Sequence, residues 1–348
     1  MASLLHVSGC LYVLKNILIS SLLFFNSLVY PSPAMSFLAC TNNTVPCLPG
    51  KPVTDYFKTL KFSDGYSNLW GPQHQHVSQD QSTVTLLLDR YSGSGFKSKE
   101  AYMYGFFNAA IKLQAGYTAG VLTSFYLSNN EVYTGKHDEV DMEFLGTIPG
   151  EPYKLQTNVY GNGTGDGPHL IGREQQFHLW FDPTQDFHNY SILWTPHHIL
   201  FFVDSIPIRR FPKVPSLGGT YPSKPMSVYA TIWDASSWAT EGGKYKANYS
   251  YEPFLGTYTD FMINGCSEED MKCWYGFLDT FIPSNLNDPL RDALKFVRNN
   301  YMTYDYCHDF QRYPKGSMPE CPPEVIKNLD ESSILLFGGT QYNNAEDQ

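Results

Sequence analysis

The sequence has little positive charge, and this limits the partners that it can bind. Its 348 residues include 24 Lys and Arg against 34 Asp and Glu, which gives a formal net charge of −10, and only 17% of the residues are charged. Nucleic acids and anionic membranes are bound through clusters of Lys and Arg. The composition therefore argues against both kinds of partner.

The apolar run near the N-terminus is too short to span a membrane. Lys15 precedes residues 17–30, a run that serines and an asparagine interrupt, whereas a spanning helix needs about 20 predominantly apolar residues. A basic residue before a short apolar stretch is typical of a secretory signal peptide. We expect residues 1–35 to be that signal peptide, with its cleavage site left open, and the protein to be secreted. An uncleaved signal anchor is the alternative.

The cysteines lack the spacing of a zinc site, because no second cluster of Cys or His accompanies the pairs. Cys10 lies in the expected signal peptide, and the six that remain are an even number, as in the disulfide framework of a secreted protein. Local pairing is the simplest of the possible connectivities. It would join Cys40 to Cys47, Cys266 to Cys273 and Cys307 to Cys321.

Helical periodicity and internal repeats are both missing between residues 53 and 258. Short runs rich in β-branched and aromatic residues, separated by Gly and Ser clusters, predict strands instead. Residues 195–198 contain a proline and predict a hairpin between two of these runs. The pattern indicates an all-β antiparallel sandwich. The runs are 83–88, 102–113, 121–127, 187–194 and 199–208.

The composition changes towards the C-terminus. Residues 289–297 have apolar side chains at helical spacing and predict the one convincing helix of the chain. The segment after Cys321 begins with two prolines and ends in polar residues, so we expect residues 322–348 to be disordered.

An unusual concentration of acids occurs in the stretch HDEVDMEFLG at residues 137–146. At the period of a strand, Glu139, Asp141 and Glu143 fall on one face and three apolar residues on the other. Like charges at neighbouring positions repel, so at least one carboxyl should keep its proton at neutral pH. Glycoside hydrolysis needs one ionised and one protonated carboxyl. A solvated polar face and a calcium or magnesium site are the alternatives, and spacing alone leaves the stereochemistry of hydrolysis open.

The same decapeptide resembles HDEIDFEFLG, the active-site signature of the plant xyloglucan endotransglucosylase/hydrolases of glycoside hydrolase family 16. The resemblance covers about residues 52–321, and Thr147-Ile148-Pro149 resembles the divergent third group of that family. It implies a concanavalin-like jelly roll with a groove across its concave sheet. Further matching blocks include SGSGFKS at 92–98, LQTNVYGNG at 155–163, GREQQFHLWFDP from 172, and YDYCHDFQRY from 304.

The resemblance assigns roles to particular residues. It implies that Glu139 is the nucleophile, that Glu143 is the acid/base and a contact of the substrate, and that Asp141 hydrogen-bonds the nucleophile. It also makes the Cys266–Cys273 and Cys307–Cys321 pairs family disulfides. Ser237 replaces an acid that many relatives carry, which puts a charge-assisted bond to sugar in doubt. The further substrate-binding residues that it implies are Gln156, Thr157, Asn158, Gly172, Arg173, Glu174, Ser237, Trp238, Gly242 and Arg312.

Four sites match the glycosylation sequon, and Asn162 in a glycine-rich stretch is the best candidate. The expected organisation is a signal peptide at 1–35, a catalytic jelly roll at 52–258, a disulfide-containing extension with one helix at 259–321, and the tail. The other sequons are Asn42, Asn189 and Asn248.

The resemblance implies a secreted, monomeric enzyme of the cell wall or apoplast. It would cut the β-1,4-glucan backbone of xyloglucan through a covalent glycosyl-enzyme and pass the glycosyl group to another xyloglucan end or to water. No cofactor or metal is implied. A related glucan activity is one alternative, and a catalytically silent glucan-binding protein on the same fold is another.

Overall fold

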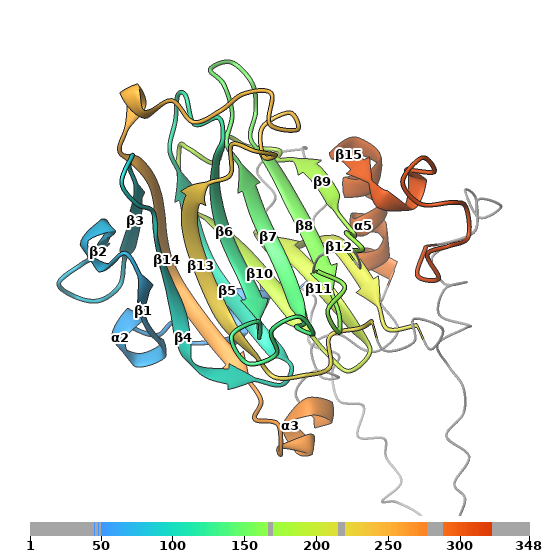
Figure 1. Cartoon of the computed structure of the whole chain (residues 1–348). Coiled ribbons are helices and arrows are strands. Elements are labelled where there is room, and N and C mark those ends of the chain that lie inside the picture. Colours follow the sequence, from blue (N-terminus) through green and yellow to red (C-terminus); the bar gives the residue numbers. More distant parts are fainter. Residues whose placement is uncertain are drawn as a thin grey trace, which may run out of the picture.

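Two antiparallel sheets packed face to face form the body of the computed structural model (Figure 1). The structure describes residues 45, 48, 50–165, 170–214, 220–276 and 288–321. The expected signal peptide, the sequon at Asn42, the proposed Cys40–Cys47 pair and the tail after Cys321 lie outside these residues.

Within the described residues, one sheet has eight strands and the other has seven. The order of the eight-stranded sheet is β1 (Tyr66–Trp70), β4 (Ser94–Tyr102), β13 (Met226–Asp234), β6 (Val121–Ser128), β7 (Glu139–Leu145), β8 (Lys154–Tyr160), β9 (Gln175–His178) and β15 (Met302–Asp305). The order of the seven-stranded sheet is β12 (Ile206–Pro212), β11 (His198–Val203), β10 (His188–Trp194), β5 (Gly105–Leu113), β14 (Phe254–Gly265), β3 (Val84–Leu88) and β2 (Gln75–Val77).

The helices described are short, except for one near the C-terminus. α5 (Asp288–Asn300) contains the predicted helix and lies against β12, at the edge of the sandwich where β15 joins the other sheet (Figure 1). The others are α2 (Phe62–Gly65), α3 (Met271–Gly276) and the 3-10 turns η1 (Val53–Tyr56), η2 (Pro72–His74), η5 (Tyr249–Tyr251) and η6 (Tyr306–His308).

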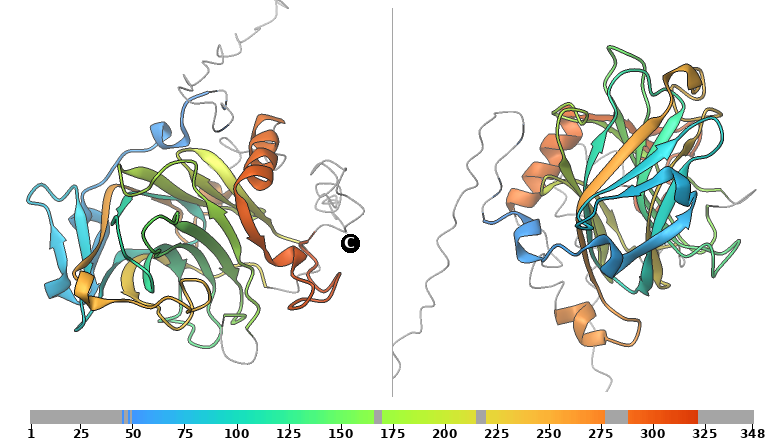
Figure 2. Two further views of the ribbon diagram at one scale, coloured as in Figure 1. Left: turned by 90° about the horizontal axis from the view of Figure 1, so that it is seen from above. Right: turned by 90° about the vertical axis from the view of Figure 1, so that its left-hand side faces the viewer.

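The core lies between the two sheets, and aromatic rings fill much of it. Phe144 of β7 meets Tyr190 of β10 edge to face, with ring centroids 4.6 Å apart, which is a favoured geometry for aromatic pairs. Figure 2 shows the two layers edge on. The predicted antiparallel sandwich is therefore confirmed, and so is the hairpin that joins β10 to β11.

Two of the predicted strands are each broken in two. The run 102–113 divides at Met103–Tyr104, where Tyr104 has a φ of +68°. The run 199–208 divides at Asp204 and Ser205, whose φ values of +48° and +66° are those of a tight hairpin turn. Positive φ is uncommon outside glycine and gave no signal in the apolar pattern. The short helix α3 was also missed.

The C-terminal extension continues the sandwich. β14 runs through the expected boundary at residue 258, and β15 pairs with β9, so the extension adds the last strand to the eight-stranded sheet. The predicted pairs Cys266–Cys273 and Cys307–Cys321 are both formed. One lies by α3 and the other by β15, at well separated places in Figure 1.

Candidate active site

Strand β7 carries the three acids on the face that points away from the core. Glu139 and Glu143 are partly exposed and Asp141 is 6% exposed, while Val140, Met142 and Phe144 are buried between the sheets. His137 precedes the strand, with its Nε2 3.8 Å from Oε2 of Glu139. The alternation predicted for this stretch is thus present, and we call the side that carries the acids the acid face.

Amides line the acid face on the side of β8 and β9. Gln156 lies opposite Glu143, and Gln176 lies opposite Gln156. The Nε2 of Gln156 donates to Oε2 of Glu143 at 2.7 Å, and the Nε2 of Gln176 donates to Oε1 of Gln156 at 2.8 Å. This chain of hydrogen bonds fixes the orientation of the Glu143 carboxyl.

Hydroxyl groups and aromatic rings line the acid face on the side of β6 and β13. Tyr126 lies opposite Asp141, and its ring is stacked on that of Tyr229 at a centroid distance of 5.1 Å. The hydroxyls of Ser124 and Thr231 lie 2.7 Å apart. The sequence reasoning missed these residues, although strand alternation in residues 121–127 would have placed Ser124 and Tyr126 on one face.

Burial and mutual repulsion raise the pKa of two of the acids. Burial is the main cause for Asp141, whose pKa lies well above its usual value; Glu139 and Glu143 raise it further and Arg209 opposes them. Burial also raises the pKa of Glu143 to about 7, against the hydrogen bond from Gln156 and with a contribution from Glu139. A protonated Glu143 beside other acids is the combination that the like-charge argument predicts.

A buried carboxylate anchors the start of β7. Asp138 is fully buried and accepts hydrogen bonds from the backbone N–H groups of Asn162, Ser223 and Lys224 at 2.6, 2.8 and 3.0 Å. The Lys224 ammonium also lies 2.9 Å from Oδ1 of Asp138. Two loops are therefore tied to the residue that precedes Glu139.

The predicted substrate residues of β8 do not share one face. Gln156 and Asn158 lie on the acid face. Thr157 is fully buried on the other face, where its hydroxyl and carbonyl accept hydrogen bonds from Arg209 at 2.9 and 2.8 Å. Its side chain therefore faces the core and supports the sheet, because neighbouring residues of a strand point to opposite sides.

Gly172, Arg173 and Glu174 form the turn into β9, and the structure separates their roles. Arg173 is 2% exposed and binds Glu320 inside the protein, so its side chain is not available to a ligand either. Glu174 binds Arg312 through two hydrogen bonds of 2.7 and 3.1 Å. A Cβ atom on Gly172 would lie 2.1 Å from Oε1 of Glu174, so a larger residue would have to displace the ends of these two side chains.

Ser237, Trp238 and Gly242 lie in the loop that follows β13. Trp238 is 36% exposed and Trp233, at the end of β13, is 37% exposed, with ring centroids 6.4 Å apart. Ser237 is exposed, and Gly242 adopts a φ of +66° with open space around it. The two indole rings are suited to contact with sugar rings, and Trp233 was not among the predicted substrate residues.

A cavity of about 370 Å³ lies just beyond Glu143, between the loop after β7 and the loop after β13. Leu145, Lys154 and His178 occupy neighbouring register positions and line it. Lys154 and Glu241 form an ion pair of 2.5 Å in its wall. The cavity is of a size that ligand pockets have.

Neither a metal cluster nor a spanning helix occurs in the part of the chain that the structure describes. No group of three or more His, Cys, Asp or Glu side chains in those residues is arranged to hold a metal ion. In the same residues, no helix is both long enough and apolar enough to cross a membrane.

Comparison with known proteins gives matches over most of the chain. The family described as glycosyl hydrolases family 16 matches residues 62–251, and the family described as the xyloglucan endo-transglycosylase C-terminus matches residues 269–321. A "probable xyloglucan endotransglucosylase/hydrolase protein 30" of Arabidopsis thaliana is 46% identical, with 85% of this chain and 87% of that protein covered. "Xyloglucan endotransglucosylase/hydrolase protein 31" of the same plant is 48% identical over 78% of this chain and 92% of that protein. A solved β-1,3-1,4-glucanase from a mouse hindgut metagenome is 21% identical, with a TM-score of 0.45 over 62% of this chain and 97% of that chain.

Proposed function

The chain belongs to glycosyl hydrolase family 16, among the plant xyloglucan endotransglucosylase/hydrolases, and on that premise we propose that it is a retaining enzyme acting on xyloglucan. It cleaves the β-1,4-glucan backbone and passes the newly formed end to another xyloglucan chain or to water. The substrate class follows from the names of the relatives, and the chemistry follows from the acid face.

The observation that carries the proposal is the placement of three acids on one face of β7. The pKa of Glu143 is raised to about 7, whereas Glu139 at the other end of the same face lies beside His137. A glycosidase needs one carboxyl that keeps its proton and one that is ionised, and the raised pKa of Glu143 suits it to the first role.

The proposed reaction has two steps. The carboxylate of Glu139 attacks the anomeric carbon, the glycosidic C–O bond breaks, and Glu143 gives its proton to the departing oxygen. In the second step the Glu143 carboxylate takes a proton from the hydroxyl of an acceptor sugar or from water, and that oxygen displaces Glu139 from the anomeric carbon. Asp141 between them would hold a proton and hydrogen-bond the nucleophile, because its pKa lies well above the usual range.

The groups beside the acids support polysaccharide binding. On one side, Gln156 and Gln176 present amides that can both donate and accept hydrogen bonds to sugar hydroxyls. On the other, Tyr126 and Trp233 present rings, and the buried Tyr229 supports the ring of Tyr126. Together with Trp238 and Arg312, they form the substrate surface that we propose.

We further propose that the enzyme works in the cell wall after secretion and acts as a monomer. The two disulfides suit an oxidising compartment. Asn162 is exposed in a turn with a φ of +53° and is the sequon that we propose to be glycosylated. Asn189, by contrast, lies within β10 and its side chain accepts a hydrogen bond from Asn108.

The test is product analysis on xyloglucan with and without a fluorescent xyloglucan oligosaccharide as the acceptor. Label that enters long polymer, and that is absent with the Glu139→Gln variant, would establish transfer. Reducing ends that form at the same rate with or without acceptor would make the protein a hydrolase. Binding without any product would overturn the catalytic proposal and leave a glucan-binding protein.

A further inference from the structure

We propose that Glu320, in the C-terminal extension, is a positioning residue that sets the affinity of the enzyme for the acceptor sugar. It acts through Arg173 on the turn formed by Gly172, Arg173 and Glu174, which we call the acceptor wall. This role rests on the proposed function, because it concerns the second step of the proposed reaction.

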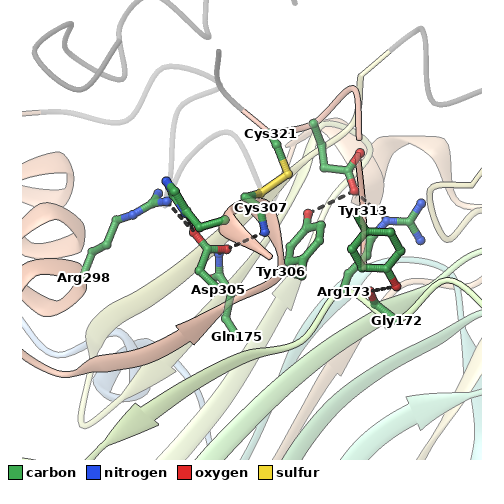
Figure 3. The surroundings of a disulfide bond; sticks show 11 residues. Gly172, Arg173, Gln175, Arg298, Asp305, Tyr306, Cys307, Tyr313 and Cys321 are labelled. Atoms are coloured by element: carbon green, nitrogen blue, oxygen red, sulfur yellow. Dashed lines mark hydrogen bonds and ion pairs between the residues drawn. A yellow bond between two sulfur atoms is a disulfide. The ribbon is translucent and has the colours of Figure 1, made fainter. Parts of the chain in front are cut away.

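Glu320 lies at the centre of a buried contact between the extension and the sheet, with Arg173 on one side and Tyr306 on the other. Figure 3 shows where Arg173 and Tyr306 lie. The side chain of Glu320 is 1% exposed, and its Oε1 accepts hydrogen bonds from Nε of Arg173 at 2.6 Å and from the hydroxyl of Tyr306 at 3.0 Å. A buried guanidinium needs a charged partner, since an isolated buried charge is costly. Arg173 therefore depends on Glu320 for its position.

Arg173 connects this contact to the strand beside β7. Its backbone N–H donates to Oδ1 of Asn158 at 2.8 Å, and its guanidinium lies 3.5 Å from the carbonyl oxygen of Val159. Asn158 lies opposite Asp141 in the register of β7 and β8. A shift of Arg173 would therefore move Asn158, which lies on the acid face opposite Asp141.

The extension also holds both neighbours of Arg173. The hydroxyl of Tyr313 donates to the carbonyl of Gly172 at 2.7 Å, and the backbone N–H of Tyr306 donates to the carbonyl of Glu174 at 3.2 Å. Arg312 binds the Glu174 carboxylate at 2.7 Å. Each residue of the acceptor wall thus has a contact with residues 306–320.

The acceptor wall lies on the side of β7 where the acceptor must bind. Glu143 is hydrogen-bonded to Gln156 of β8, so its carboxyl is turned towards β8 and β9. The acid/base serves the leaving group and then the acceptor, and both must therefore occupy that side. Glu174 lies close enough to Glu143 to raise its pKa.

Covalent bonding holds the two ends of this contact together. Glu320 immediately precedes Cys321, and Tyr306 immediately precedes Cys307, with a disulfide between the two cysteines (Figure 3). Glu320, which binds Arg173, and Tyr306, which donates to Glu320, are therefore fixed relative to each other. This explains how a short segment near the end of the chain can fix a turn in the middle of it.

The experiment uses the full secreted protein and separates acceptor binding from cleavage. Glu320→Gln keeps the shape of the side chain and removes its charge. We expect the KM for the fluorescent xyloglucan oligosaccharide to rise at least about fivefold, while kcat for hydrolysis at saturating xyloglucan without acceptor stays within about twofold of wild type, because saturation offsets weaker binding of the leaving group on the same side. Arg298→Gln is the matched control, because it also removes an Arg–carboxylate pair of the extension, with Asp305, without touching the acceptor wall.

A second variant separates positioning from stability. Arg173→Met/Glu320→Leu replaces the buried pair with apolar residues of similar volume, a change that often leaves stability intact. We expect it to fold, to hydrolyse xyloglucan, and to show a higher acceptor KM than Glu320→Gln does. A parallel loss of transfer and of the hydrolytic kcat at saturating xyloglucan, or an unchanged acceptor KM in both variants, would overturn the role of Glu320 alone. A wild-type protein without activity on xyloglucan would overturn the proposed function and this role together.

Discussion

The two faces of β7 belong to one strand of seven residues but face opposite physical demands. Val140, Met142 and Phe144 are completely buried between the sheets, where removal of apolar surface from water stabilises the fold. Glu139, Asp141 and Glu143 alternate with them, and the raised pKa values of Asp141 and Glu143 record the cost of holding acids together. Burial of the apolar face stabilises the fold, whereas the clustered acids destabilise it and supply the groups for catalysis.

The surroundings of the two faces differ in the same way. Phe144 meets the ring of Tyr190, and the core around it is aromatic and aliphatic. Glu143 meets the amide of Gln156, and beneath the sheet the charge of Arg209 favours the ionised form of Asp141. The acid face is therefore supported by polar groups that limit its cost, a pattern found where function is built on a stable scaffold. Changes on the two faces should have opposite consequences.

Loss of the nucleophile should have the largest effect. Glu139→Gln keeps the shape of the side chain but removes the attacking carboxylate, so we expect kcat on xyloglucan to fall by more than about 10⁴-fold. The midpoint of urea unfolding should stay the same or rise, because one of three clustered charges is gone. Glu100→Gln, at an exposed position of β4, is the control for the loss of a carboxylate. An active Glu139→Gln enzyme would show that another residue is the nucleophile.

Replacement of the acid/base Glu143 should lower kcat less than replacement of Glu139, and it should change how the rate depends on pH. Glu143 must be protonated for the first step, and its pKa is about 7, so kcat/KM should fall about tenfold per pH unit above pH 7. Glu143→Gln should lower kcat by about 10²- to 10⁴-fold and remove this alkaline limb. An alkaline limb that persists in Glu143→Gln would assign the titration to a different group.

A substitution on the apolar face of β7 should lower the stability of the protein and leave its catalytic chemistry unchanged. Phe144→Ala would leave a cavity beside Tyr190, and we expect the free energy of unfolding to fall by about 3–5 kcal/mol. Molecules that stay folded should keep their pH profile, because the acids are untouched. Urea unfolding followed by tryptophan fluorescence measures the first effect, and initial rates at low temperature measure the second. A loss below about 1 kcal/mol would mean that the core can close around the missing ring.

Strand periodicity was enough to predict the acidic and the apolar face of β7, because a period of two assigns each residue of the strand to a face. The sandwich and the two disulfides followed from short-range patterns in the same way. The breaks at Tyr104 and at Asp204 did not, since they depend on positive φ values that apolar spacing does not encode. Resemblance carries over a block of residues, whereas neighbours in a strand point to opposite sides, so it did not reveal that the side chain of Thr157 faces the core.

The contacts between residues far apart in the chain could not be predicted from the sequence. Nothing near Glu320 marks it as the partner of Arg173, which precedes it by 147 residues. Arg312 could be read as a surface charge until the structure placed it on Glu174. Tyr229 belongs to β13, which pairs with β6, and only this pairing brings its ring onto Tyr126. Such contacts depend on strand order, which local patterns do not determine.

The cost of the acid face should itself be measurable, as the smallest of these effects. The pKa of Glu143 is about 7 in the folded protein but about 4.3 in an unfolded chain, so between these values the folded state binds more protons. Stability due to this group is therefore complete below about pH 4.3 and is lost as the pH rises through 7. Since Glu143 is partly exposed, we expect Glu143→Gln to be more stable than wild type by about 1–2 kcal/mol at pH 8 and to lose that advantage at pH 4. Urea unfolding of both proteins across this range measures the difference, with Glu100→Gln as the control. A constant difference would mean that the neighbouring acids adjust their own protonation to absorb the change, and that the cost belongs to the cluster and not to Glu143.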